Sequence, residues 1–184
     1  FPALQLKGLG AAETRRSWSA LRYGSWYIDD LVEAWNVYVA GENTWRENRY
    51  EGLRVVSIDL TGFGRPQLVG WLGKHYHLLV GKAIPAVVFG VIVVSGQVHG
   101  KRIPLLRKIV RCQPEQTETD YRAIVLREAV RLDLPGDVKV MDAGFKLNEL
   151  LYAGVKGFVL RMQSNCTARR SHLPDYTGRG AKAK

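Results

Sequence analysis

The stretch AVVFGVIVVS, residues 86–95, is apolar at nearly every position and rich in valine. β-Branched residues favour strands, and a run without polar alternation is typical of a strand that is buried on both faces. We therefore expect a central strand of a sheet here. The apolar run begins at Ala83 but contains Pro85 and Gly90, and it is shorter than the roughly 20 residues that cross a bilayer, which excludes a membrane span.

The segments on either side of this stretch also have strand character. Leu53–Leu60 (LRVVSIDL) is rich in β-branched residues. Gln97–Lys101 is expected to be a turn in which Gly100 supplies the positive φ that a hairpin needs. Ile103–Val110 follows as a third strand, with a start weakened by Pro104. Three strands in succession are therefore predicted.

Helices and strands alternate in the rest of the chain. Thr117 is a candidate N-cap for a helix that ends at Pro135-Gly136. The later elements are a strand at Val138–Met141, a helix at Leu147–Tyr152 and a fifth strand at Gly157–Met162. The resulting order, β-β-β-α-β-α-β, predicts an α/β fold with a mixed sheet.

The first 52 residues differ from the rest in composition. Ile28, Leu31, Val32 and Trp35 follow the spacing of an amphipathic helix. Tryptophans recur every eight to ten residues at Trp18, Trp26, Trp35 and Trp45, as in the core of a small helical bundle. We therefore expect two parts, a helical N-terminal segment at 1–52 and the α/β part at 53–184.

The basic charge lies in the second part. The chain has a formal net charge of +10 and an isoelectric point of about 9.8. Residues 1–52 carry six basic and seven acidic side chains, so the whole excess falls within 53–184. This distribution favours a polyanionic partner, nucleic acid before an anionic membrane surface. Two distant cysteines, Cys112 and Cys166, argue against a disulfide scaffold or a structural zinc site and favour a reducing compartment.

Two aspartates are placed to carry chemistry. Asp59 is expected at the end of the first predicted strand and Asp142 at the end of the fourth. If these strands are parallel neighbours, both carboxylates leave the same edge of the sheet. Convergent carboxylates hold the hard cations that nucleases use. A strand-end aspartate is also a common turn former or helix cap, so each residue alone indicates little.

Four segments together resemble the DDE transposases of bacterial insertion sequences. VVSIDLTG (55–62) looks like the family's first-aspartate motif and VKVMDAGF (138–145) like its second. GVKGFVLR (154–161) resembles the helix-to-strand passage that follows, and PDYTGRG (174–180) the basic stretch that leads into the family's insertion region. The resemblance extends from Leu53 to the C-terminus and rests on the order and spacing of the motifs.

The resemblance implies a ribonuclease-H-like catalytic core that cleaves and transfers DNA strands. It implies two Mg²⁺ or Mn²⁺ ions, with Asp59 as the bridging ligand and Asp142 as a ligand of one ion. The implied partner is double-stranded DNA, both transposon ends and target, and binding as a homodimer is left open. The implied location is the bacterial cytoplasm, at the nucleoid when bound, and residues 1–52 would be the remnant of a DNA-binding or linker region.

The family's third carboxylate is a glutamate on a later helix, and this sequence ends at Lys184, before that helix is expected. Glu149 is too close to Asp142 for that role and is expected to face solvent. An incomplete transposase fragment is therefore the leading interpretation. The alternatives are a non-catalytic nucleic-acid-binding module derived from a transposase and a stand-alone metal-dependent nuclease with a further carboxylate.

Basic side chains provide the candidate contacts to phosphate. His75 and His77 could form a metal pair on a strand, but without a third ligand a basic DNA-facing loop or plain surface is favoured. Phosphate contact is independent of base sequence, so these residues indicate a polyanion without naming a target site. The candidates are Lys74, Lys82, Lys101, Arg102, Arg161, Arg169, Arg170 and Arg179.

Overall fold

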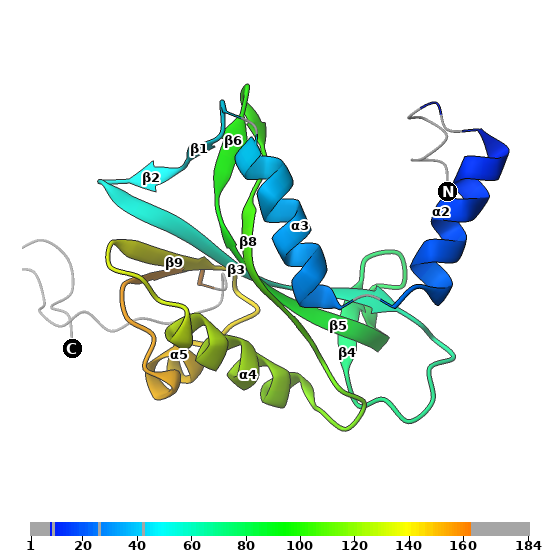
Figure 1. Cartoon of the computed structure of the whole chain (residues 1–184). Helices are drawn as coiled ribbons and strands as arrows, with labels where there is room; N and C mark the ends of the chain where they lie inside the picture. The colour runs from blue at the N-terminus through cyan, green and yellow to red at the C-terminus, as the bar shows by residue number, and fades with distance from the viewer. Residues whose placement is uncertain (1–7, 9, 26, 42, 163–184) are drawn as a thin grey trace, which may run out of the picture.

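The structure is a computed structural model that describes residues 8, 10–25, 27–41 and 43–162 (Figure 1). Its helices are α2 (Ala11–Tyr23), α3 (Ile28–Gly41), α4 (Glu118–Arg131) and α5 (Leu147–Ala153). Its strands are β1 (Arg46–Glu47), β2 (Arg49–Tyr50), β3 (Leu53–Gly64), β4 (Lys74–His77), β5 (Lys82–Val94), β6 (Gly96–Val98), β7 (Lys101–Arg102), β8 (Leu105–Arg111), β9 (Asp137–Met141) and β10 (Phe158–Leu160). None of these helices is long and apolar enough to span a membrane.

One mixed sheet organises the molecule. Its strands run in the order β10-β9-β3-β5, and both β4 and β8 pair with β5. β5 is antiparallel to β3 and to β8, whereas β9 is parallel to both β3 and β10. The predicted α/β class and mixed sheet are thereby confirmed, and β5, which contains residues 86–94 of the valine-rich stretch, lies inside the sheet.

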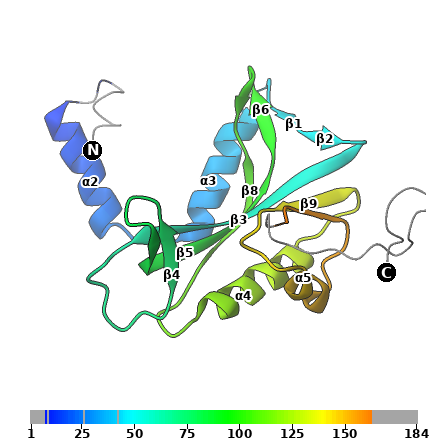
Figure 2. The ribbon, with the colours of Figure 1, turned by 180° about the vertical axis from the view of Figure 1, so that it is seen from behind.

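Helices α4 and α5 cover one face of the sheet. Ile58 of β3 and Ile92 of β5 are buried in one cluster with Leu126 of α4 and Leu150 of α5. Figures 1 and 2 show these two helices on the side of β3 and β5 that faces away from α3. A Cβ atom on Gly90 would lie 2.1 Å from a methyl carbon of Val125, so a glycine is needed for α4 to approach the sheet this closely.

The other face of β5 is less covered than the sequence predicts. Its even-numbered residues from Ile84 to Val94 are buried, but its odd-numbered residues from Val87 to Val93 are only half-buried. The expectation of burial on both faces was therefore wrong for one of them. The physical reason is that α3 packs mainly against β8 and leaves part of the sheet uncovered.

Helix α3 and the described segment that follows it are attached to the sheet. The indole of Trp35 donates to the carbonyl of Pro104 at 2.8 Å, and the indole of Trp45 donates to the carbonyl of Ile103 at 2.9 Å. The amide of Asn36 accepts from the N–H of Leu106 at 2.8 Å and donates to its carbonyl at 2.7 Å. These tryptophans anchor backbone, which corrects the bundle interpretation for both of them.

The predicted segment 1–52 also ends differently from expectation. Residues 46–50 form β1 and β2, which pair with β6 and β3, so this stretch is extended and not helical. The predicted boundary at residue 52 thus falls in the turn between the paired strands β2 and β3. Trp26 and the side chain of Trp18 lie outside the described residues.

A buried ion cluster fixes the start of β9. The side chain of Asp137 is fully buried and accepts from Arg54 Nε at 2.7 Å and from Arg107 Nη1 at 2.5 Å. The N–H of Leu134 donates to the same carboxylate at 3.0 Å. Burial alone would raise the pKa of Asp137, but the hydrogen bonds from Arg107, Arg54 and Leu134 outweigh it and lower the pKa to about 2.

Replacing this carboxylate tests the cluster. The substitution Asp137→Asn leaves two guanidinium groups without their counter-ion, and we expect it to lower the free energy of unfolding by about 3 kcal/mol. Chemical denaturation measures the change. Glu128→Gln, which removes a surface ion pair with Arg131, is the control and should cost no more than about 1 kcal/mol. Equal losses in the two variants would contradict the assigned role.

The same cluster predicts a pH dependence. Because the pKa of Asp137 is lower in the folded protein than its ordinary value, its contribution is complete above about pH 4 and disappears as the pH falls through about 2. We expect the wild type to lose about 2 kcal/mol from this group over that range. The measurement is the difference in unfolding free energy between wild type and Asp137→Asn, which should shrink as the pH falls and not stay constant.

Candidate functional site

The parallel pairing of β3 and β9 brings the two predicted aspartates together. This pairing ends at Ile58 and Met141, so Asp59 and Asp142 are the next residues on neighbouring strands. Asp142 directly follows β9, as the sequence predicts. Asp59 does not end its strand, since β3 continues to Gly64 in pairing with β5. The strand-end prediction for Asp59 was therefore wrong. Only the pairing of β3 with β9 ends just before Asp59, at Ile58.

Both carboxylates are held by the backbone. Oδ1 of Asp59 accepts from the N–H of Leu60 at 2.8 Å, and Oδ1 of Asp142 accepts from the N–H of Gly144 at 2.8 Å. A Cβ atom on Gly144 would lie 2.9 Å from that same oxygen, so a larger residue would press on the carboxylate. Within the described ranges, neither aspartate forms an ion pair, and their charges are left without a cationic partner.

Asp59 and Asp142 share the wall of one cavity of about 270 Å³. Lys74 and His75 of β4 also line it, and α4 contributes Glu118. The other lining residues are Leu60, Tyr76, Ala83, Tyr121 and Gly144. Elements far apart in sequence therefore close around the two carboxylates.

Tyr121 ties β4 to helix α4. Its hydroxyl donates to the carbonyl of Lys74 at 3.2 Å, and its side chain is buried against Ala86 and Val88. Burial raises the pKa of Tyr121 well above its ordinary value, so the phenol remains a hydrogen-bond donor over the physiological range. This bond and the pairing of β4 with β5 together hold Lys74 at the cavity.

A third strand adds a cation at the same level of the sheet. Leu160 of β10 is paired with Met141, and the N–H of Arg161 donates to the carbonyl of Met141 at 3.0 Å. Arg161 therefore directly follows β10, as Asp142 directly follows β9. It lies beside Asp142, on the side of the acidic pair away from Asp59. Its exposed side chain is available to an anion that approaches the site.

The remaining predicted phosphate contacts are dispersed. Lys82 lies at the start of β5, in the hairpin with β4. Lys101 and Arg102 form β7, and Arg102 lines a different cavity, together with Asn48 and Ser95. The structure therefore gathers Lys74 and Arg161 around the aspartates and leaves these other cations elsewhere. Arg169, Arg170 and Arg179 lie outside the described residues, as does the segment 174–180.

Glu118 is the cavity residue that sequence reasoning missed. It follows the N-cap Thr117, and a first-turn acidic residue is explained by the helix dipole alone. Only the packing of α4 brings it to the cavity, where it forms an ion pair with Arg122. In the part of the chain that is described, no group of three or more His, Cys, Asp or Glu side chains is arranged to hold a metal ion.

Two further expectations need correction. His75 and His77 belong to a strand, β4, and not to a loop, and a Cβ atom on Gly62 would lie 2.4 Å from the Cβ atom of His75. Glu149 does not face solvent, because it accepts hydrogen bonds of 2.9 to 3.1 Å from Arg122 and links α5 to α4. Glu149 is thus a structural residue.

The bond between Tyr121 and Lys74 gives a direct prediction. Tyr121→Phe removes only the hydroxyl, and we expect it to lower the free energy of unfolding by about 1 kcal/mol through the lost hydrogen bond. Denaturant titration measures the effect. Tyr152→Phe, at an almost fully exposed tyrosine of α5, should leave stability unchanged. Indistinguishable stabilities for the two variants would argue against a tether between α4 and β4.

Comparison with known proteins finds little that is similar. No family model matches the chain, and no curated protein matches it. Among solved structures, the NurA nuclease from Sulfolobus solfataricus aligns with a TM-score of 0.28 and 19% sequence identity. The alignment covers 73% of this chain and 40% of that nuclease, so the chain spans less than half of its length. A TM-score this low does not establish a shared fold.

Proposed function

We propose that this protein cleaves phosphodiester bonds in DNA with a divalent metal ion held by Asp59 and Asp142. One observation carries the proposal: two carboxylates lie in adjacent register without a cationic partner among the described residues, at a shared cavity of a strongly basic chain. Two unpaired anions at neighbouring positions repel each other. A cation between them relieves this repulsion and attracts the phosphate of a nucleic acid.

The residues present fit a hard metal ion. Carboxylate oxygens are the ligands that Mg²⁺ and Mn²⁺ prefer, and Mg²⁺ is often bound through one or two carboxylates, with water and substrate phosphate completing its shell. Asp59 and Asp142 supply that number. When bound, the ion would activate water and stabilise the leaving oxygen. A second ion, as the transposase resemblance implies, would need a further carboxylate, because Glu118 at the cavity wall is paired with Arg122.

The chain's own residues position the substrate. Lys74 and Arg161 lie on either side of the acidic pair and would bind the phosphates that flank the scissile bond. Tyr121 holds the backbone of Lys74 in place. The hydrogen bonds from Leu60 and Gly144 restrict the rotation of the two carboxylates, so the ligands are oriented before the metal arrives.

We further propose a ribonuclease-H-like core. The chain order β3, β5, β8, α4, β9, α5, β10 supports it, since it follows the β-β-β-α-β-α-β order that the resemblance implies. The antiparallel set β3, β5 and β8, followed by the parallel strands β9 and β10, also supports it. The short strands β4, β6 and β7 are additions at the edges of this arrangement.

Transposition is the more specific proposal for the same site. It rests on the motifs around Asp59 and Asp142, and it requires that a DNA 3′-hydroxyl replaces water as the nucleophile. In that case double-stranded transposon ends and target DNA are the substrates, a homodimer on DNA is the working unit, and the protein acts at the nucleoid. A stand-alone nuclease would only cleave DNA. A binding module would neither cleave nor transfer DNA strands.

The catalytic role of the two aspartates is tested by Asp59→Asn and Asp142→Asn. We expect each to reduce Mg²⁺-dependent cleavage of plasmid DNA by at least about 10³-fold, because the ligand charge is lost while the side-chain shape is kept. DNA affinity, measured at fixed salt, should remain within a few-fold of wild type. Asp30→Asn, at an exposed position of α3, is the matched control and should cleave normally.

The two enzyme classes differ in their products. A labelled duplex with a free 3′-hydroxyl is incubated with a second, unlabelled plasmid and Mg²⁺ or Mn²⁺. Covalent joining of the label to the plasmid supports transposition, whereas shortened labelled fragments alone support a nuclease. DNA binding without either product, with any metal, would contradict the proposed catalysis and leave a binding module.

A further inference from the structure

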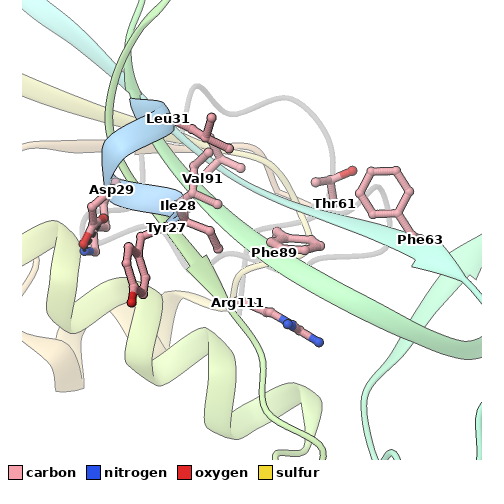
Figure 3. A pocket seen from close by; sticks show the side chains of 11 residues that line it. Tyr27, Ile28, Asp29, Leu31, Thr61, Phe63, Phe89, Val91 and Arg111 are labelled. Atoms are coloured by element: carbon pink, nitrogen blue, oxygen red, sulfur yellow. Dashed lines mark hydrogen bonds and ion pairs between the residues drawn. The ribbon is translucent and has the colours of Figure 1, made fainter. Parts of the chain in front are cut away.

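A second cavity, of about 790 Å³, lies on the incompletely covered face of the sheet. It is formed between the start of α3 and strands β3, β5 and β8, and Figure 3 shows Phe89 between Tyr27 and Phe63 along it. The rings of Phe63 and Phe89 meet edge to face at 5.8 Å. Tyr27 is 75% exposed and Phe63 59% exposed, so these rings are free to contact a ligand.

This aromatic groove reaches Val91, the strand partner of Asp59. Thr61 and Phe63 follow Asp59 at intervals of two residues, which places all three on the same side of β3. Asp59 is paired with Val91 and Thr61 with Phe89, and both partners line the groove. At about 3.3 Å per residue, Phe63 lies about 13 Å along the strand from Asp59. The groove therefore begins beside one member of the acidic pair.

The charges at the rim favour an anionic ligand. Lys108 is paired with Asp29 at 2.7 Å, which neutralises one side. Arg111 forms no ion pair with the described residues, and its guanidinium lies 5.6 Å from the ring centroid of Trp71. An exposed cation beside aromatic rings matches a phosphate beside nucleobases better than it matches a purely apolar peptide.

We propose that the groove binds unpaired nucleotides of the DNA strand that enters the catalytic site. Their bases stack on Phe63, Phe89 and Tyr27, and Arg111 contacts their phosphates. Bases in an intact duplex already stack on one another and present only their edges, so the ligand is single-stranded. The position of these nucleotides next to the scissile bond rests on the proposed function, but the stacking itself does not depend on catalysis.

Binding of a fluorescein-labelled dT12 oligonucleotide to the full chain tests the proposal. Anisotropy is measured in EDTA, so that no cleavage occurs, for wild type and for the double variant Tyr27→Ala/Phe63→Ala. We expect at least about tenfold weaker binding of dT12 by the double variant, and little change for a blunt-ended duplex. Phe63→Tyr keeps the ring and should bind as wild type does. Tyr152→Ala removes a still more exposed ring outside the groove and should also bind normally.

A photochemical readout locates the bases directly. A dT12 that carries 5-iodouracil should crosslink on irradiation to a peptide containing Tyr27, Phe63 or Phe89. Asp59→Asn should retain both dT12 affinity and the crosslink, so a failure of the catalytic proposal would remain distinguishable from a failure of this one. Unchanged dT12 affinity in a double variant with a wild-type circular dichroism spectrum would overturn the inference. Crosslinks confined to peptides outside the groove would also overturn it.

Discussion

The buried carboxylate of Asp137 is the interaction on which the arrangement of the site depends. It is bonded to Arg54 of β3 and Arg107 of β8, so one side chain at the start of β9 is tied to two other strands of the sheet. A slip of one residue between β3 and β9 would turn every side chain of one strand to the opposite face. It would also remove Asp142 from the level of Asp59. The ion cluster excludes that slip, because its charges would then be buried without partners.

Local signals in the sequence predict the ends of helices α4 and α5 but not the added strand β4. Thr117 begins α4, where its side chain accepts from the N–H of Asp120, and Gly154 ends α5 with a positive φ of 76°. Both are helix-capping signals that act within a few residues of the helix end. β4 has no such signal, because its identity as a strand depends on pairing with β5. Glu118 is similar, since its place at the cavity follows from where α4 packs and not from its own neighbours in sequence.

The tryptophans and the charge show how composition can mislead. Trp35 and Trp45 use their indole N–H groups on carbonyls of residues 103 and 104, a contact that no periodic pattern records. Part of the positive charge is likewise used inside the protein. The buried side chains of Arg122 and Lys139 are bonded to Glu149 and Asp133, and they are not available to a polyanion. Net charge therefore indicates the kind of partner and overstates the number of cations that can reach it.

The side chain of Asn36 has a consequence for how copies of this protein meet. Its amide accepts from the N–H of Leu106 and donates to the carbonyl of the same residue, which is the bonding that a neighbouring strand would provide. A strand at the border of a sheet otherwise offers these groups to any extended segment of another molecule. At Leu106 of β8 these groups are already bonded to Asn36 of helix α3. The edge of β8 is thereby blocked at Leu106 by a single amide, with no need for a charged or proline residue at that position.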